Sequence, residues 1–306
     1  MSEFKLTILG RGSALPTKVS MQPSQILEHN EKLMLIDCGE GTQISIRRLD
    51  VRISRLNDIF ISHLHGDHCL GVIGLLSSFG MMGRRTGLTI HCHPEFEEFL
   101  KMQIKFFGGE LGYDLKFNTF SPFKTNVIYQ EKKLKVTAFP LKHSIPTSGF
   151  LFEETGKEPH LIKEKIDFYG VPISKYADII NGEDFVTENG FVIPNNQLTR
   201  PATPPTKYAY CSDTMYTEKN LELLKGVDCL YHESTFLEED KARAKETMHS
   251  TAAQAGKFAK LSEAKKLLLG HFSSRYKNFE KFKEEAMQEF ENTEIAEERK
   301  TYIFGQ

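Results

Sequence analysis

Short apolar runs rich in β-branched side chains alternate along the chain with amphipathic stretches. This alternation is typical of strands and helices that pack in layers, and it predicts an α/β fold. Functional groups in α/β sheets gather beyond the carboxyl ends of strands, so the residues that end these runs are the first candidates for a site. Six runs end in a possible metal ligand or acid: KLMLID at Asp37, DIFISH at His63, KVTAFPLKH at His143, KYAYCSD at Asp213, DCLYHE at Glu233 and KLLLGH at His271.

Residues 155–200 interrupt this alternation. A short helical pattern and a Gly-Val-Pro break precede FVTENGFVI, in which the Asn189-Gly190 pair predicts a β-hairpin turn. The PATPP that follows is typical of a stiff linker. We therefore expect one domain over residues 1–306, with an inserted, protruding arm at 155–200. The alternative is an ordinary excursion packed on the surface.

Composition narrows the class of protein. The chain has 306 residues, of which 40% are hydrophobic, which suits one large or two modest domains with a real core. A net charge of −2 neither supports nor excludes nucleic acid as a partner. The five cysteines are widely spread without a C-x-x-C pair, so neither a disulfide framework nor a thiolate zinc site is indicated. No apolar run suits a signal peptide or reaches the ~18 residues of a membrane span, so we expect a cytoplasmic protein.

The densest chemical signal is FISHLHGDHCLGVIGLL, which places His63, His65, Asp67 and His68 within six residues. Imidazole and carboxylate are ligands that zinc accepts, and alternate residues beyond a strand end can point to the same side. His63 and His65 can therefore hold one ion, with Asp67 and His68 placed for a second. Chance clustering of surface histidines is the alternative. Two ions need further ligands, and distant strand ends supply three: His143, Asp213 and His271.

H-x-H-x-D-H followed by distant His, Asp and His resembles the metallo-β-lactamase superfamily of binuclear metal hydrolases. Further stretches resemble one branch of it, the ribonuclease Z family of tRNA 3′-processing endonucleases: LIDCGEGTQISIRR, HGDHCLGVIGLL, CSDT, YHEST, MHSTAAQAG and GHFSSRY. The resemblance spans nearly the whole chain in the right order. It implies the metallo-β-lactamase fold, an αββα sandwich, with the arm inserted as a tRNA-binding exosite.

The resemblance also implies a partition of the ligands. One metal ion is expected on His63, His65 and His143, and another on Asp67, His68 and His271, with Asp213 bridging. Two Zn²⁺ per subunit are expected, although Mn²⁺ and Fe²⁺ accept the same set. Two ions ~3.5–4 Å apart would polarise a water and neutralise charge on the phosphate oxygens. Asp67 is then both a ligand and the expected acceptor of the water's proton.

His249 is the candidate general acid for the departing ribose oxygen. Thr251 and Gln254 form a T-x-x-Q capping-box pattern, so His249 is expected just before a helix N-terminus, whose free amides favour an anionic phosphate. Glu233 is expected to hold this histidine in its tautomer. A loop histidine with a hydrogen-bonding role alone is the alternative.

Other titratable residues carry weaker expectations. Asp37 is expected either to fix a ligand histidine or to satisfy turn amides. His232 is expected to face away from the site, because neighbouring side chains in a strand point to opposite faces. His91 and His93 share an H-x-H spacing, but a helix start follows them instead of an Asp-His pair, and we assign them no metal.

By implication of the resemblance, the chain is a zinc-dependent endoribonuclease that cuts precursor tRNA 3′ of the acceptor stem and leaves a 3′-hydroxyl. It is expected to act as a homodimer, without a membrane or another protein partner. Candidate phosphate contacts are residues 16–18, Arg47, Arg48, Arg84, Arg85 and residues 273–275.

The arm has five Lys or Arg against seven Asp or Glu, which offers no overall attraction to a polyanion. Two departures from the family pattern also bear on RNA binding. Ile173-Ser174 replaces the Gly-Pro that often follows Gly-Val-Pro, and residues 16–21 read PTKVSM where the family has P-x-K-x-R-N. The rival functions are hydrolysis of small phosphodiesters or esters by the same fold, and RNA binding without catalysis.

Overall fold

The computed structural model describes residues 4–49 and 52–305. The chain divides into two packing units. The larger unit comprises Met1–Gln130, Lys135–Glu153 and Thr206–Gln306, and the smaller one Glu131–Leu134 and Glu154–Pro205.

Two seven-stranded sheets form the larger unit within the described residues. The first has the order β20 (Thr301–Phe304), β1 (Phe4–Gly10), β3 (Ser24–His29), β4 (Lys32–Ile36), β5 (Leu56–Phe60), β6 (Leu88–Cys92) and β7 (Leu115–Thr119). Its strands β4 to β7 run parallel. Three helices pack their apolar residues on this sheet: α1 (Thr42–Arg47), α3 (Gly71–Met81) and α4 (Pro94–Phe106).

The second sheet has the order β19 (Thr293–Ile295), β17 (Leu267–Gly270), β16 (Cys229–Glu233), β15 (Lys207–Cys211), β10 (Ser148–Glu154), β9 (Leu134–Pro140) and β8 (Asn126–Glu131). Helices α9 (Ala252–Leu261) and α10 (Glu280–Met287) cover it. Shorter elements join the layers: β2 (Gly12–Ser13) pairs with β18 (Phe272–Ser273), and α2 (Gly66–Cys69) and α8 (Lys241–Glu246) are single turns or slightly longer.

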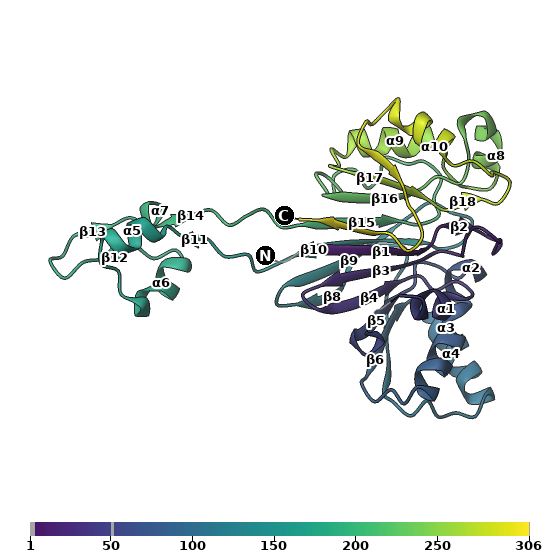
Figure 1. The fold of residues 1–306 in the computed structure, drawn as a ribbon, viewed down its shortest axis with the longest axis horizontal. Coiled ribbons are helices and arrows are strands. Elements are labelled where there is room, and N and C mark those ends of the chain that lie inside the picture. The colour runs from purple at the N-terminus through teal and green to yellow at the C-terminus, as the bar shows by residue number, and fades with distance from the viewer. Residues whose placement is uncertain (1–3, 50–51, 306) are drawn as a thin grey trace. The chain divides into compact units, whose positions relative to one another are not determined.

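The two sheets face each other through an aromatic layer. The Phe60 ring lies 5.8 Å from Phe150 and 5.3 Å from Phe152, and the Tyr208 hydroxyl donates to Gln25 of the opposite sheet. Helices therefore lie outside and sheets inside, in four layers (Figure 1). Strands such as β16 and β17 are buried on both faces, which explains why the sequence shows continuous apolar runs there. The αββα sandwich expected from the sequence is confirmed.

All six strand expectations are also correct: β4, β5, β9, β15, β16 and β17 occupy the apolar runs that end in a titratable residue. The helix expected after His249 is α9. Its N-cap Thr251 accepts from the Gln254 amide, and the Gln254 side chain accepts from the Thr251 amide, so the capping box is present.

The smaller unit has its own apolar core of Ile166, Val171, Ile179, Phe185 and Leu198. It contains α5 (Lys163–Phe168), a 3₁₀ turn (Ile173–Lys175), α6 (Tyr176–Ile180) and α7 (Asn195–Leu198), with the pair β11 (His160–Leu161) and β14 (Thr199–Arg200). Strands β12 (Phe185–Val186) and β13 (Val192–Ile193) form the hairpin expected from Asn189-Gly190. Gly190 takes the left-handed conformation at φ 80°, as this turn requires.

Candidate metal centre

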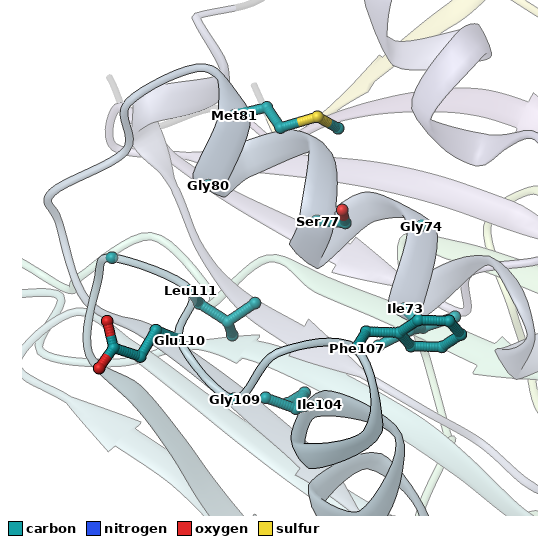
Figure 2. A pocket seen from close by; sticks show the side chains of 11 residues that line it. Ile73, Gly74, Ser77, Gly80, Met81, Ile104, Phe107, Gly109, Glu110 and Leu111 are labelled. Carbon is teal, nitrogen blue, oxygen red and sulfur yellow. The ribbon is translucent and has the colours of Figure 1, made fainter.

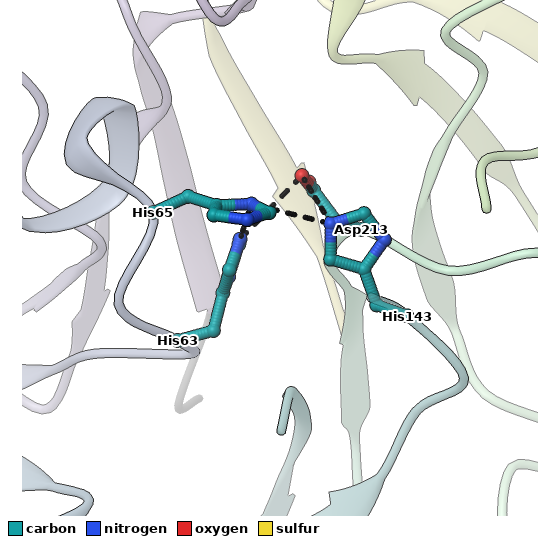
Figure 3. Close-up of side chains that lie close together, drawn as sticks. All are labelled: His63, His65, His143 and Asp213. Carbon is teal, nitrogen blue, oxygen red and sulfur yellow. Dashed lines mark hydrogen bonds and ion pairs between the residues drawn. The ribbon is translucent and has the colours of Figure 1, made fainter. Parts of the chain in front are cut away.

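Three histidines and an aspartate lie close together just beyond the carboxyl ends of β5, β9 and β15. His65 Nδ1 lies 3.2 Å from both His63 Nε2 and His143 Nε2. Asp213 Oδ2 lies 3.5 Å from His63 Nε2 and 3.7 Å from His143 Nε2. Figure 3 shows His63 and His65 opposite His143 and Asp213, with the four polar ends turned toward one another.

A second group lies on the other side of Asp213. Its Oδ1 atom is 3.3 Å from His68 Nε2 and 3.1 Å from His271 Nε2, and these two nitrogens are 3.3 Å apart. Asp67 Oδ2 completes the group at 3.6 Å from each of the two nitrogens. Asp213 therefore gives one carboxylate oxygen to each group.

These separations fit metal coordination. Four ligands placed tetrahedrally at zinc bond lengths lie about 3.3–3.6 Å from one another, close to the distances within both groups. Asp213 Oδ1 is buried and accepts no hydrogen bond from the described residues. A buried carboxylate oxygen without a donor is costly, and a cation between the ligands would satisfy it. The residues present therefore fit two metal ions.

Hydrogen bonds at the outer ring nitrogens fix the tautomers of two histidines from the first sheet. His68 Nδ1 donates to Asp37 Oδ2 at 2.7 Å. Ser62 Oγ also donates to Asp37, at 2.8 Å, so it accepts the proton of His63 Nδ1 at 3.0 Å. Because the Nδ1 atoms carry the protons, both Nε2 lone pairs face the centre, as metal ligation requires.

Hydrogen bonds at Nδ1 also fix the tautomers of the two histidines that follow strands of the second sheet. His143 Nδ1 donates to the Met248 carbonyl at 3.0 Å. His271 Nδ1 lies 2.9 Å from Thr235 Oγ1, whose own proton goes to Glu233 Oε2 at 2.7 Å. His143 and His271 thus also turn unprotonated Nε2 atoms toward the centre.

Burial and neighbouring charges favour the metal-binding protonation states of His63 and Asp213. Burial lowers the pKa of His63 to about 4, so this imidazole is neutral at physiological pH. Burial alone would raise the pKa of Asp213, but the neighbouring His271, His68 and His63 outweigh it and hold that pKa well below its usual range. Neutral imidazole beside an ionised carboxylate is the combination that divalent metals bind. For His68, burial is outweighed by the charges of Asp213, Asp67 and Asp37, which raise the pKa well above its usual value, so a metal must displace a proton from that ring.

Backbone strain collects at the centre. Among the described residues, four non-glycine positions with left-handed backbone conformations lie at the site: Ala14 (φ 58°), Asp37 (φ 54°), Met248 (φ 58°) and His271 (φ 60°). The Ala14 amide donates to Asp67 Oδ2 at 2.7 Å, and the Met248 carbonyl accepts from His143. Such conformations cost energy and persist where surrounding contacts enforce them, typically at functional sites.

The buried Glu233 and the partly buried His249 form a hydrogen-bonded pair beside the centre. His249 Nδ1 donates to Glu233 Oε1 at 2.9 Å, and its ring lies 4.9 Å from the His143 ring. Burial lowers the pKa of His249, but the charge and hydrogen bond of Glu233 outweigh it and raise this pKa to about 9. His249 also lies within ligating distance of Asp213 and His271. No described residue bonds to its Nε2 atom, which leaves that nitrogen available to a substrate.

A pocket of about 500 Å³ opens over the centre. It is lined by residues 13–16, Gln22, Glu40, residues 65–67, Leu70, Asp213 and His249. A second cavity, of about 740 Å³ between α3 and residues 104–112, contains none of the ligand residues, and its lining is mainly apolar (Figure 2).

The remaining sequence candidates fall outside the metal groups. Asp37 fixes a proposed ligand histidine, as expected, because it accepts from the His68 ring. It also accepts from the Ser62 amide, in the segment after β5, at 2.8 Å. His232 faces away and packs 5.4 Å from the Phe258 ring of α9. His91 bonds to Asp58 at 2.9 Å, and His93 lies 3.1 Å from Ser148 Oγ.

Sequence reasoning missed four groups that orient the ligands: the Ser62 hydroxyl, the Thr235 hydroxyl, the Met248 carbonyl and the Ala14 amide. Ser62 and Thr235 each lie within two residues of a candidate named from the sequence, and that adjacency is the signal that was available.

The chain is similar to known protein families and to individual known proteins. Residues 4–157 match the family model described as Anti-Pycsar protein Apyc1, and residues 198–272 match the Beta-lactamase superfamily domain. A Ribonuclease Z of Phocaeicola vulgatus is 48% identical over 298 residues, which cover 97% of this chain and 96% of the relative. A Ribonuclease Z of Porphyromonas gingivalis is 45% identical over 299 residues, with 98% of each chain covered.

Solved structures with low identity share the fold. The short form of human tRNase Z aligns with a TM-score of 0.72 at 23% identity, over 97% of this chain and 98% of that one. The metallo-beta-lactamase fold protein YhfI of Bacillus subtilis aligns with a TM-score of 0.70 at 18% identity, over 99% and 100% of the two chains.

Proposed function

This chain belongs to the ribonuclease Z family, and we propose that it removes 3′ trailers from precursor tRNA by hydrolysing one phosphodiester and leaving a 3′-hydroxyl on the tRNA. The observation that carries the proposal is the pair of His/Asp groups joined through Asp213. A hydrolase of small phosphodiesters would use the same groups. It would have no need of the separately packed unit at Glu154–Pro205, which has its own core.

We propose that two zinc ions complete the site. One would be held by His63, His65 and His143 and the other by Asp67, His68 and His271, with the Asp213 carboxylate next to both groups. When bound, such ions polarise the attacking water and neutralise charge on the phosphate oxygens. Manganese or iron would fit the same donors.

Asp67 accepts the proton of the attacking water in this proposal. Its Oδ2 atom is committed to the Ala14 amide and to the ligand cluster. Its Oδ1 atom has no hydrogen-bond partner among the described residues, and the side chain lines the pocket over the centre. The free oxygen therefore lies where a water in that pocket would meet it.

His249 donates the proton that the departing oxygen needs. Glu233 and Thr235 hold Nδ1, at 2.9 and 3.2 Å, so Nε2 is the atom left for substrate. In the reaction, the water oxygen bonds to phosphorus, the bond from phosphorus to the tRNA 3′ oxygen breaks, and His249 protonates that oxygen.

The inserted unit is proposed to bind the body of the tRNA, so that the acceptor end reaches the centre. Its separate core of Ile166, Val171, Ile179, Phe185 and Leu198 allows it to act as a preformed binding element. Its acidic balance means that contacts other than bulk charge attraction must contribute, and exposed rings such as Phe168 and Phe191 are available for them.

A homodimer is proposed on the basis of exposed apolar side chains near the cavity of Figure 2. Met81 is 79% exposed and lines this cavity together with the exposed Phe107. Phe106 and Met102 of α4 are exposed as well, Phe106 to 83%. Large exposed apolar side chains, when they gather in one patch, are typical of protein interfaces. Phe106→Lys is expected to give a monomer by light scattering, and an unchanged dimer would exclude this surface.

A cytoplasmic location is proposed because all five cysteines are buried free thiols, as in proteins of reducing compartments. Within residues 4–49 and 52–305, no helix has the length and apolar character to cross a bilayer.

The proposed reaction is tested by incubating the protein with a precursor tRNA that carries a 3′ extension and mapping the cut. Cleavage that leaves a 3′-hydroxyl is expected, and Asp67→Ala should abolish it while tRNA binding is retained. Turnover of bis-p-nitrophenyl phosphate without any RNA cleavage would reject the proposal in favour of a small-phosphodiester hydrolase.

A further inference from the structure

A separate pocket of about 470 Å³ opens beside His143, in the larger unit. Its walls are residues 140–147, Thr217 with Lys219, and Pro122 with Phe123. His143 is the only proposed metal ligand that lines it, whereas His65, Asp67 and Asp213 line the pocket over the centre. The two pockets thus border the ligand cluster at different residues, and the His143 imidazole is almost completely buried. Figure 3 shows His143 opposite His65 in that cluster.

Hydrogen bonds hold the walls of this pocket in place. The Leu141 amide donates to the Thr147 carbonyl at 2.9 Å and closes the loop that carries His143. The Met215 amide donates to the Lys142 carbonyl at 2.8 Å, and the Asn220 side chain donates to the Pro140 carbonyl at 2.9 Å. The loop is thereby tied to the segment that follows β15. A pocket with fixed walls is typical of a ligand site.

The lining suits a nucleotide. Phe123 is 75% exposed and offers a ring face, and the loop adds the apolar side chains of Leu141, Ile145 and Pro146. The side chains of Lys142 and Lys219 are exposed and make no ion pair with any described residue. No Asp or Glu lines the pocket. An aromatic face beside uncommitted cations is the combination that binds bases by stacking and phosphates by charge.

The bond that is cleaved indicates which part of the precursor lies toward the pocket beside His143. The leaving group is the 3′ oxygen of the tRNA, so the last tRNA nucleoside must lie on the side of His249, which lines the pocket over the centre. The phosphate stays with the trailer, whose first nucleotide must leave the cluster by another side. The pocket beside His143 borders the cluster at a ligand that the pocket over the centre does not share.

We propose that this pocket binds the first trailer nucleotide, with its base on Phe123 and the following phosphate at Lys142 and Lys219. The assignment rests on the proposed tRNA 3′ cleavage and extends it to the segment that is removed.

Two precursor substrates test the phosphate contact: one with a single trailer nucleotide ending in a 3′-hydroxyl, and one with five trailer nucleotides. Only the longer substrate has a phosphate after the first trailer nucleotide. The double variant Lys142→Ala, Lys219→Ala is expected to lose about tenfold more kcat/KM on the longer substrate than on the shorter one. The control Lys281→Ala, on α10 outside both pockets, should treat the two substrates as the wild type does.

A substrate that lacks the first trailer base tests the stacking contact. Phe123→Ala is expected to reduce kcat/KM at least fivefold on the normal substrate, and Phe123→Tyr should restore it. On the abasic substrate, Phe123→Ala and the wild type should cleave equally.

The outcomes separate the two proposals. Suppose that the wild type cleaves precursor tRNA. The pocket assignment is then wrong if the double lysine variant loses the same factor of kcat/KM on both trailer lengths. It is also wrong if Phe123→Ala loses the same factor of kcat/KM on the substrates with and without the first trailer base. If the wild type cleaves no precursor tRNA, both proposals are overturned.

Discussion

Replacing Glu233 by Gln tests how the centre handles the leaving group. The carboxylate is completely buried. Its Oε1 atom accepts from the Thr214 amide at 3.0 Å, His249 Nδ1 at 2.9 Å and the Ser250 amide at 3.0 Å. Its Oε2 atom accepts from the Thr235 amide at 2.9 Å and the Thr235 hydroxyl at 2.7 Å. Every contact of this side chain requires an acceptor.

Gln keeps the shape but offers one oxygen only. With that oxygen facing the three donors around His249, the new amide group faces Thr235. The Thr235 hydroxyl can rotate to accept, while the Thr235 amide is left without a partner. One buried, unsatisfied N–H costs about 1–3 kcal/mol, so the variant should fold, with a melting temperature lower by several degrees.

The catalytic effect should be larger and should depend on the leaving group. Without the negative charge of Glu233, protonated His249 loses its main stabilisation, and general acid catalysis contributes about 10²–10⁴ in rate. Glu233→Gln is therefore expected to cleave precursor tRNA at least about 100-fold more slowly. Nitrophenolate leaves without a proton, so hydrolysis of bis-p-nitrophenyl phosphate should fall far less. Single-turnover rates on both substrates, with metal content measured for each protein, make the comparison.

If Glu233→Gln binds its full metal content and its single-turnover rate falls by the same factor on precursor tRNA and on bis-p-nitrophenyl phosphate, this role for Glu233 and His249 is refuted. Unchanged tRNA cleavage would refute it as well. Lower metal content would place the effect instead on His271, which Glu233 reaches through Thr235.

Three further predictions address other parts of the structure. Because Glu153 pairs directly with Lys207, residues 155–205 can be replaced by an Asn-Gly turn between β10 and β15. This variant should bind precursor tRNA more weakly while still hydrolysing bis-p-nitrophenyl phosphate. Unchanged tRNA affinity would disprove the exosite. Asp213→Asn removes the shared carboxylate charge and should lower bound metal below one ion per chain by mass spectrometry, whereas two ions retained would disprove the bridging role. Burial lowers the pKa of His93 to about 4. As the pH falls from about 6.5 toward 4, this histidine takes up a proton in the unfolded chain before it does so in the folded one, and stability is lost. His93→Gln should flatten the fall in melting temperature over that window, and an unchanged profile would contradict the pKa shift.

The strands that carry the site were predictable because they are buried on both faces. Runs such as KLLLG in β17 have no polar alternation to obscure them, and each ends where the apolar layer ends. The titratable residue that follows marks the sheet edge. Sequence spacing therefore located the residues that the structure brings together, although their expected division between two groups came from family resemblance.

Contacts made through space were beyond sequence reasoning. The Ala14 amide and the Met248 carbonyl reach the ligands only because both residues adopt left-handed backbone conformations, for which neither residue type gives a signal. The pocket beside His143 joins residues 122–123 to residues 217–219, which are far apart in the chain. The arm hairpin was accessible because the Asn189-Gly190 pair is a local signal.

The most direct test of the centre is a crystal structure of the zinc-loaded protein with anomalous data at the zinc edge. Two peaks are expected on either side of Asp213. One should be bound by His63, His65 and His143, and the other by Asp67, His68 and His271. A single peak, or His143 or His271 turned away from the metal, would contradict the two-ion centre on which the proposed cleavage of tRNA depends.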